Sequence, residues 1–370
     1  MRVSILKETA PGETRVAATP ESVKKLIALG HAVTVETDAG RIAGFLNDAY
    51  SEAGADIAPD AGQANETADI VLGVRAPEIG ALKQGQTAVA LFDPFTADFA
   101  PFNKKSITTL AMEFTPRITR AQSMDALSSQ SNLAGYRAVI EGAQIYGRAM
   151  PMMMTAAGTI APAKVFVMGA GVAGLQAIAT ARRLGAVVSA TDVRPAAKEQ
   201  VGSLGAKFIA VEDEEFKAAE TAGGYAKQMS DEYQAKQAAL VAEHIAKQDI
   251  VVTTALIPGR PAPELVSADM VKSMKPGSVI VDMAATQGGN CALTKPDEIV
   301  YEGGVKIAGY TNLPARLPAD ASALYAKNLL AFLPLITGED GALNLETEDE
   351  IVQAMLITRG GETTNERVSA

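Results

Sequence analysis

Residues 164–195 read KVFVMGAGVAGLQAIATARRLGAVVSATDVRP, and this stretch decides the fold. A short apolar run, Val165–Met168, predicts a buried strand, and a helical pattern follows over Ala173–Leu184. A second strand is expected over Ala186–Thr191, and it ends at an acidic residue, Asp192. A strand, a helix and a strand in this order predict part of a parallel sheet with the helix packed on one face.

Three glycines, Gly169, Gly171 and Gly174, join the first strand to the helix at G-x-G-x-x-G spacing. The first permits a tight turn, the second lets the backbone approach a pyrophosphate, and the third lets helix and strand pack closely. Asp192 can bond a ribose 2′-hydroxyl and would repel a 2′-phosphate, whereas the nearby Arg194 could meet such a phosphate. The sequence therefore predicts a dinucleotide site that prefers NAD to NADP; the alternative is a glycine-rich turn that binds nothing.

The composition sets wider limits on the protein. The chain has 370 residues, 48% hydrophobic and 21% charged, which predicts a globular protein of two or three domains. Its net charge of −10 argues against nucleic acid or anionic lipid as a direct partner. The single cysteine, Cys291, excludes a disulfide framework and is expected to be a buried, inert thiol. We expect a soluble protein, because no apolar run reaches the length of a membrane span.

Strands and helices also alternate before the glycine-rich stretch. Apolar runs predict strands over Arg2–Leu6, His31–Glu36, Asp69–Val74, Thr87–Leu91 and Ile107–Ala111, and a helix over Pro20–Leu29. This region lacks a glycine fingerprint, so we expect no phosphate site in it.

The predicted fold class is α/β, with two Rossmann-like domains that have mostly parallel sheets, the second inserted in the first. A long helix, Ala319–Phe332, could return to the first domain. We therefore expect a discontinuous first domain, residues 1–131 and 317–370, and an NAD(H)-binding domain, residues 132–316. The tail Gly341–Thr358 alternates enough to predict short strands.

Groups that could transfer protons are scarce. The two histidines, His31 and His244, are expected to be structural, and the cluster Met150 with Met152–Met154 is expected to serve packing. No catalytic triad or metal cluster stands out, so we expect no metal. Such an enzyme is plausible if its reaction moves a hydride and no proton, because catalysis then consists mainly of holding donor and acceptor carbons within about 3–3.5 Å.

A polar segment before a predicted helix is the second candidate region. It contains Arg117, Arg120, Gln122, Asp125 and Ser128. A carboxylate beside an arginine fixes the guanidinium, and a glutamine can donate and accept at once. From spacing alone, the segment is either a capped helix start or part of a functional site.

Several motifs spread over nearly the whole chain carry a resemblance to a known family. They include RAQSMDALSSQSNLAGYRAV (120–139), MPMMMTAAGT (150–159), GVAGLQAIATARRLGA (171–186), ETAGGYAK (220–227), TTALIPGRPAP (253–263), MKPGSVIVDMA (274–284), GGNC (288–291) and TNLPARLPADAS (311–322). These segments resemble the NAD(H)-binding component, the alpha subunit or domain I, of proton-translocating NAD(P) transhydrogenase.

The resemblance implies an activity and partners. The chain would bind NAD(H) and pass a hydride from NADH to NADP⁺ held on a partner component, coupled to proton translocation by a membrane-spanning subunit. It implies a homodimer in the cytoplasm, peripheral to the inner membrane through its partner subunits. Because the sequence has no membrane span, it resembles the bacterial form in which this component is a separate subunit.

The resemblance also implies roles for individual residues. Arg117 and Asp125 would orient each other and the nicotinamide ribose, Gln122 would bridge toward the NADP(H)-binding component, and Ser128 would meet the carboxamide. The remaining residues expected to contact NAD(H) are Val172, Ala173, Asp192, Val193, Arg194, Gln237 and Leu256, together with Gly224 and Tyr225 in a loop that closes over the nucleotide. The structural alternatives are a helix cap for Asp125, a core contact for Leu256 and a solvated helix face for Gln237.

Alanine dehydrogenase, which shares the fold, is the alternative reading. The segment LKETAPGETRVAATPE, with Arg15, is similar to the N-terminal segment of those enzymes. They place a lysine where this chain has Arg75, a histidine near Asp93 and an aspartate near Thr286, groups that bind pyruvate and move its proton. These departures make an amino-acid dehydrogenase a weaker hypothesis than a transhydrogenase component. A non-catalytic NAD-binding protein is the third hypothesis.

Overall fold

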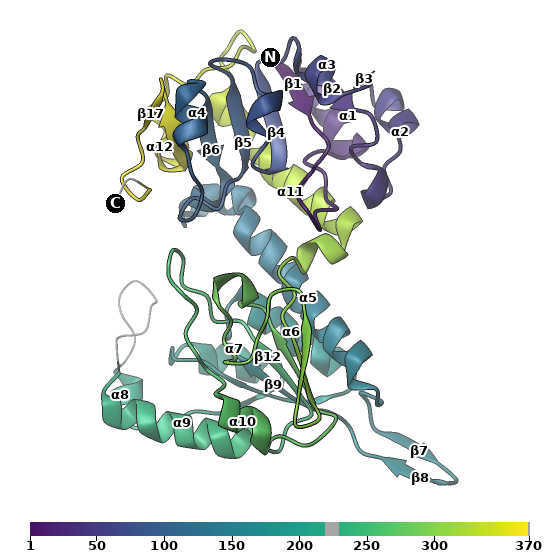
Figure 1. Cartoon of the computed structure of the whole chain (residues 1–370), viewed down its shortest axis with the longest axis vertical. Helices are drawn as coiled ribbons and strands as arrows, with labels where there is room; N and C mark the ends of the chain where they lie inside the picture. The colour runs from purple at the N-terminus through teal and green to yellow at the C-terminus, as the bar shows by residue number, and fades with distance from the viewer. Residues whose placement is uncertain (219–228, 369–370) are drawn as a thin grey trace. The chain divides into compact units, whose positions relative to one another are not determined.

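The computed structural model describes residues 1–218 and 229–368, and they form two compact units (Figure 1). Unit 1 is Met1–Gln130 with Pro314–Ala370, and unit 2 is Ser131–Leu313. Each unit contains one large, mostly parallel sheet with helices packed against it, so the expected α/β class is confirmed. Among the described residues, no helix combines the length and apolar character needed to cross a membrane.

The sheet of unit 1 has eight strands in the order β17-β16-β6-β5-β4-β1-β2-β3. The six strands from β6 to β3 pair in parallel, and the last two in the chain, β16 and β17, add antiparallel pairs at the β6 edge. Their bounds are β1 Arg2–Ile5, β2 Ala32–Glu36, β3 Asp56–Ala58, β4 Ile70–Arg75, β5 Thr87–Leu91, β6 Thr108–Ala111, β16 Leu356–Arg359 and β17 Glu362–Thr363.

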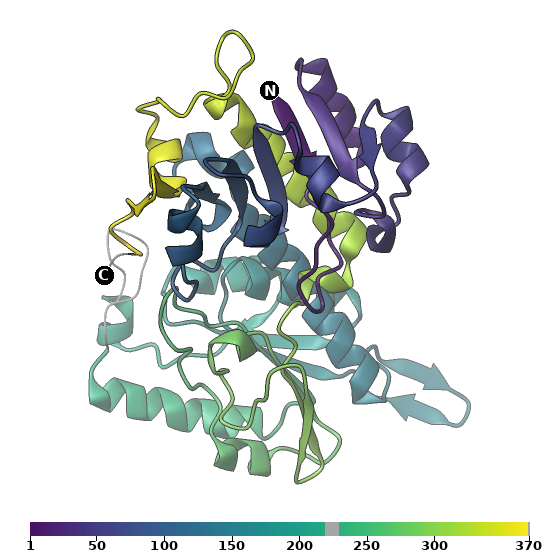
Figure 2. The same cartoon turned by 45° about the horizontal axis from the view of Figure 1, so that its top comes forward.

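Helices from both ends of the chain cover this sheet. Thr19 and Ser22 form a capping box that starts α1 (Pro20–Ala28), which lies beside α11 (Pro318–Phe332) (Figure 2). Tyr325 of α11 is fully buried, and its hydroxyl donates to the carbonyl oxygen of Gly73 in β4 at 2.9 Å. The other helices of the unit are α2 Asn47–Glu52, α3 Ala61–Asn65, α4 Ala100–Lys104 and α12 Glu350–Met355, with short 3₁₀ turns that include η3 Met112–Phe114 and η4 Thr119–Met124.

The sheet of unit 2 has seven strands in the order β11-β10-β9-β12-β13-β15-β14, parallel except for β14. From β9 the chain first adds β10 and β11 on one side, and it later adds β12 on the other side of β9, so the strand order reverses at β9. The bounds are β9 Lys164–Met168, β10 Val187–Thr191, β11 Lys207–Phe208, β12 Ile250–Thr253, β13 Val279–Asp282, β14 Ile299–Glu302 and β15 Val305–Ala308.

The helices of unit 2 pack on both faces of its sheet, which separates two buried apolar clusters. They are α6 Val172–Arg183, α7 Ala197–Ser203, α8 Glu214–Lys217, α9 Asp231–Ile245 and α10 Ala268–Ser273, while α5 Ala126–Tyr146 begins in unit 1 and continues into unit 2.

One sequence expectation is confirmed only in part, and another was wrong. The tail Gly341–Thr358, which we expected to form short strands, contains the start of β16 at Leu356. It also contains α12, whose N-cap residue Asp349 accepts a hydrogen bond from the backbone N–H of Ile351 at 2.8 Å. The run predicted to serve packing forms a hairpin, β7 Met153–Thr155 and β8 Gly158–Ile160. Met150 is buried, but Met152, Met153 and Met154 are exposed, so packing within the unit does not explain them.

Candidate functional site

The glycine turn between β9 and α6 is shaped by close approaches that exclude side chains. Gly169 has φ +105°, and a Cβ on it would lie 2.5 Å from the Thr254 hydroxyl oxygen. A Cβ on Gly174 would lie 1.8 Å from the carbonyl oxygen of Gly169, well inside van der Waals contact. Both positions therefore require glycine, as expected for a tight turn and a close helix–strand contact.

Gly171 is different, because it faces open space. It is the N-cap residue of α6, and, apart from its own neighbours in the chain, no atom of the described residues lies within 4 Å of the position that its Cβ would take. The first N–H groups of a helix have no partner within the helix, and they carry its positive dipole end. At this end of α6, where Val172 and Ala173 begin the helix, a phosphate group could approach the backbone without steric hindrance.

Asp192 lies at the carboxyl end of β10 and is held from two sides. Its Oδ2 accepts from the backbone N–H of Ala170 at 2.7 Å, inside the glycine turn. Its Oδ1 accepts from the backbone N–H and the Nε of Arg194, both at 2.9 Å. Arg194 also donates from Nη2 to Oδ2 at 3.0 Å, so the guanidinium that could have met a 2′-phosphate is engaged by Asp192.

Exposed apolar side chains gather at the same edge of the sheet. Val172, Val193, Leu256 and Ile257 are between 43% and 61% exposed, and all follow the carboxyl ends of β9, β10 or β12. Ligands of doubly wound sheets bind at this edge, and their pockets have mostly apolar walls. The core-contact alternative for Leu256 is therefore wrong.

Gln237 of α9 points inward and does not lie on a solvated helix face. Its Oε1 accepts from the backbone N–H of Val211 at 2.9 Å, and its Nε2 donates to the Thr191 hydroxyl at 3.1 Å. Thr191 directly precedes Asp192, so Gln237 ties α9 to the strand end that carries the acidic residue. Gly224 and Tyr225, the two residues expected in a closing loop, lie outside the described residues.

The polar segment of unit 1 forms η4 and the start of α5. Asp125 accepts hydrogen bonds from the backbone N–H of Ser128 at 2.8 Å and from the Ser128 hydroxyl at 2.5 Å. Asp125 therefore caps the start of α5, as the structural alternative expected. Gln122 and Arg117 are exposed. Arg120 forms ion pairs with Asp349 at 2.6 Å and Glu350 at 3.5 Å, which tie η4 to the start of α12.

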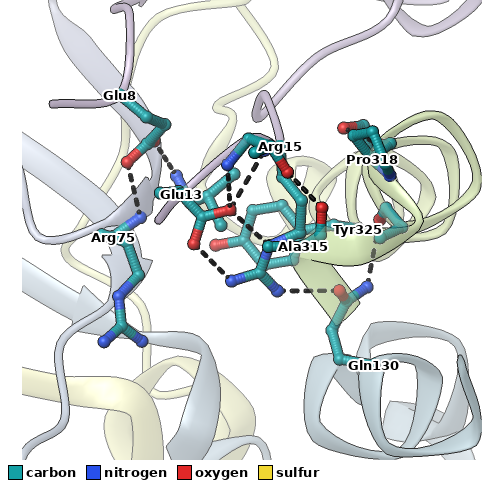
Figure 3. A network of polar contacts seen from close by, with 12 residues as sticks. Glu8, Glu13, Arg15, Arg75, Gln130, Ala315, Pro318 and Tyr325 are labelled. Atoms are coloured by element: carbon teal, nitrogen blue, oxygen red, sulfur yellow. Dashed lines mark hydrogen bonds and ion pairs between the residues drawn. The ribbon is translucent and has the colours of Figure 1, made fainter. Parts of the chain in front are cut away.

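A polar network occupies the carboxyl edge of the unit 1 sheet (Figure 3). Arg15 is buried, and its Nε and Nη2 donate to the two carboxylate oxygens of Glu13 at 2.7 and 2.6 Å, while Nη1 donates to Gln130 at 2.8 Å. Arg75 pairs with Asp93 at 2.9 Å, and Asp93 has φ +51°, a left-handed conformation rare for a non-glycine residue.

Two glutamates of this edge have raised pKa values. Burial raises the pKa of Glu8 to about 7, although the backbone N–H groups of Val74 and Arg75 donate to its carboxylate. Burial also raises the pKa of Glu113 to about 7; its Oε1 accepts from the Asp93 N–H at 2.7 Å, and its Oε2 is enclosed with no hydrogen-bond partner among the described residues. Neither glutamate was a candidate from the sequence, although both follow the ends of strands, β1 and β6.

The histidines and the cysteine have structural environments. Burial lowers the pKa of His31 and of His244, and the His244 Nε2 lies 2.8 Å from the Ser189 hydroxyl. Cys291 is buried, which raises the pKa of its thiol and confirms the expected inert thiol. Within the described residues, no group of three His, Cys, Asp or Glu side chains is placed to hold a metal ion.

Comparison with known proteins agrees with this geometry. Residues 4–134 match the family model "Alanine dehydrogenase/PNT, N-terminal domain", and residues 138–366 match "Alanine dehydrogenase/PNT, C-terminal domain". The chain belongs to the alanine dehydrogenase/PNT family.

Within the alanine dehydrogenase/PNT family, the chain is similar to transhydrogenase subunits. It is 55% identical to the first part of NAD(P) transhydrogenase subunit alpha of Rhodospirillum rubrum, over 98% of this chain and 97% of that protein. The crystal structure of transhydrogenase from Sinorhizobium meliloti superposes with a TM-score of 0.90 at 55% identity, covering 98% of this chain and 100% of the other. An L-alanine dehydrogenase structure superposes with a TM-score of 0.84 at 26% identity, covering 100% and 98% of the two chains. The resemblance expected from the sequence is confirmed.

Proposed function

We propose that this chain is the NAD(H)-binding component of a proton-translocating NAD(P) transhydrogenase. It would hold NADH while a hydride passes to NADP⁺ on a partner component, and a membrane component would couple the transfer to proton translocation. The observation that carries the proposal is the glycine turn of unit 2 with Asp192 locked beside it, in a chain 55% identical to a transhydrogenase alpha subunit.

The residues of unit 2 fit a bound NAD(H). Gly171 and the first turn of α6 would receive the pyrophosphate, because no side chain of the described residues comes within 4 Å of the Cβ position of Gly171. The carboxylate of Asp192 would accept the ribose 2′-hydroxyl and disfavour NADPH, while Val193 would contact the adenosine. The nicotinamide supplies the hydride chemistry when it is bound, and the protein groups hold and expose it.

The polar loop of unit 1 would supply further contacts to the nucleotide. Asp125 fixes Ser128 through two hydrogen bonds, which would orient the Ser128 side chain for the carboxamide. Gln122 is exposed, as a residue that bridges to a partner component must be, and Arg117 would contact the nicotinamide ribose. Transfer between two nicotinamides releases no proton at the substrate, so the site requires placement more than acid–base groups.

The alternative, an amino-acid dehydrogenase, needs cationic groups for a substrate carboxylate. Arg15 presents its guanidinium to Glu13, and Arg75 is paired with Asp93. An internal carboxylate therefore already engages each of the two arginines. Each ion pair offsets the positive charge that a substrate carboxylate would need, so this arrangement supports the transhydrogenase proposal over alanine oxidation.

We also propose that the chain forms a homodimer and that the hairpin β7–β8 contributes to it. A two-stranded hairpin is marginally stable alone in water, and this one exposes Met153, Met154 and Ile160. A second copy of the chain would cover these side chains. We propose a cytoplasmic protein that reaches the inner membrane through its partner subunits.

The decisive experiment mixes the chain with an NADP(H)-binding component of a transhydrogenase. We expect hydride exchange between the NADH and NADP⁺ pools that needs both proteins, and no reduction of NAD⁺ with alanine. If the chain binds NADH but the mixture shows no hydride exchange, the result would favour a non-catalytic NAD-binding protein. Alanine-dependent reduction by this chain alone would favour the dehydrogenase.

A further inference from the structure

Strand order locates the nicotinamide half of a bound dinucleotide within unit 2. A pyrophosphate bound at the glycine turn would lie at the end of β9, where the strand order reverses, and Asp192 would mark the adenosine half at β10. The other half must then extend over the carboxyl ends of β12 and β13, on the opposite side of β9. The chain segments that follow these two strands, residues 254–263 and 283–290, become the floor and wall of the nicotinamide subsite.

The segment 254–263 contains no helix or strand, so its shape depends on bonds from elsewhere. Thr254 fixes one end, because its hydroxyl donates to the carbonyl oxygen of Gly169 at 3.2 Å. The apolar side chains of Leu256 and Ile257 follow, 46% and 44% exposed. An exposed apolar loop needs such external bonds to hold one conformation, because burial contributes little to fixing it.

Asn290, in the segment 283–290, supplies such bonds to the segment 254–263. It is fully buried, its Oδ1 accepts from the Ala255 N–H at 3.0 Å, and its Nδ2 donates to the carbonyl oxygens of Ala255 and Pro263, both at 2.8 Å. One side chain thereby bonds both ends of the segment that carries Leu256. Its own carbonyl oxygen accepts from the N–H groups of Leu265 and Val266, at 2.8 and 3.0 Å.

Gln287 adds weaker support to the same segment. Its carbonyl oxygen accepts from the Ala262 N–H at 2.8 Å. With the side-chain amide oriented to satisfy its neighbours, its nitrogen donates to the carbonyl oxygens of Arg260 and Ile257 at 3.0 and 3.1 Å.

The segment that contains Asn290 is itself fixed by hydrogen bonds to Asp282. Asp282, at the end of β13, is fully buried and accepts from the Ala284 N–H and the Cys291 N–H, both at 2.9 Å. It also accepts from the hydroxyls of Thr253 and Thr294, at 3.0 and 2.6 Å. Both ends of the segment with Asn290 are therefore fixed to the sheet, and the amide is pre-organised for its partners.

We propose that Asn290 is a positioning residue for the nicotinamide subsite: it holds the segment 254–263 so that Leu256 and Ile257 pack against the nicotinamide ring. This inference rests on the proposed function. Asn290 touches the backbone of the loop and acts on the nucleotide only through it. The adenosine and pyrophosphate half, bound at Gly171 and Asp192, should not depend on it.

The test compares two ligands on the isolated chain, NADH and ADP-ribose, which lacks the nicotinamide. Asn290→Asp preserves the shape and the bond from Ala255 N–H but turns both amide donations into contacts between oxygen atoms. We expect NADH affinity to fall about tenfold and ADP-ribose affinity to change less than about twofold, with a weaker nicotinamide fluorescence signal from bound NADH. Gln287→Ala should also lower the ratio of NADH affinity to ADP-ribose affinity, by a smaller factor. It provides the test if Asn290→Asp does not fold.

A matched control is Asn65→Asp in unit 1. Asn65 is 1% exposed and donates from Nδ2 to Ala81 O at 2.6 Å and Gln86 Oε1 at 2.8 Å, so the same substitution breaks a comparable buried network. It should lower thermal stability without changing the ratio of NADH to ADP-ribose affinity. Equal loss of both ligands in Asn290→Asp and Gln287→Ala would overturn the inference. Failure of the unmodified chain to bind NADH would instead overturn the proposed function.

Discussion

The variant Glu113→Gln should make the stability of the protein less sensitive to pH. Burial raises the pKa of Glu113 from 4.5 to about 7, and the negative charge of the nearby Asp93 acts in the same direction with a smaller effect. Glutamine is nearly the same shape and can preserve the acceptor for the Asp93 N–H while removing the titrating group. A shift of this size corresponds to about 3 kcal/mol of stability, at about 1.4 kcal/mol per pH unit.

The sign follows from the two states of the carboxyl group. Below pH 4.5, both the folded and the unfolded chain carry the proton, and the group contributes nothing to the pH dependence. Between pH 4.5 and about 7, the folded chain retains the proton while the unfolded chain loses it, so stability falls as pH rises; above pH 7, the loss is complete. The raised pKa of Glu8 acts in the same direction and remains in the variant.

Thermal unfolding of both proteins at pH 5 and pH 8 measures this difference. At pH 5 the unfolded carboxyl is already mostly ionised, so about 2.5 kcal/mol of the effect falls between the two pH values. The unmodified protein should therefore lose up to about 5–10 °C more in Tm than Glu113→Gln, if unit 1 unfolds cooperatively. Any constant cost of the new amide cancels in this comparison. Glu52→Gln, the same substitution at an exposed position on α2, should behave like the unmodified protein. Parallel Tm profiles for Glu113→Gln and the unmodified protein would refute the reasoning.

Three further predictions concern the site and the assembly. Gly174→Ala should abolish NADH binding or lower Tm by several degrees, because its Cβ would lie 1.8 Å from a carbonyl oxygen, whereas Gly202→Ala in α7, with nothing within 4 Å, should be neutral in binding and Tm. Asp192→Asn should reduce the preference for NADH over NADPH about tenfold in equilibrium dialysis, since it removes the charge that repels a 2′-phosphate; an unchanged ratio would exclude this role. Met153→Thr with Ile160→Thr, a cross-strand pair of the hairpin, should shift the chain toward monomer in sedimentation at micromolar concentration, while a dimer of undiminished stability would place the interface elsewhere.

The sequence predicted the main strands well, because strands buried on both faces of a parallel sheet are nearly continuous apolar runs. The expected strand Val165–Met168 lies within β9, and Thr87–Leu91 coincides with β5. Two kinds of short element, a six-residue helix and a hairpin, were missed. In α12, six residues give too few turns for a helical period, and in β7–β8 the methionines do not alternate with polar residues.

The site was predictable where its residues are close in sequence. Asp192 follows a strand by one position, and Asp125 precedes Ser128 by three, so spacing alone indicated a strand-end acid and a helix cap. The Arg75–Asp93 pair depends on a left-handed backbone at Asp93 that no pattern indicates. The bonds of Asn290 reach residues 27 and 35 positions earlier, and they form only when β12 and β13 lie side by side.

The distribution of charged groups supports a protein that positions a reactant and does not exchange protons with it. Asp192 is engaged by Arg194 and the Ala170 N–H, Arg15 by Glu13, and Arg75 by Asp93. An oxidation of alanine must release a proton and bind a carboxylate, and the pairs of Arg15 and Arg75 offset the positive charge that would attract that carboxylate. Hydride exchange between two nicotinamides needs neither, and its rate depends on how closely the rings are held. The ion pairs at these positions and the apolar side chains exposed at the carboxyl edge of unit 2 suit hydride exchange better than alanine oxidation.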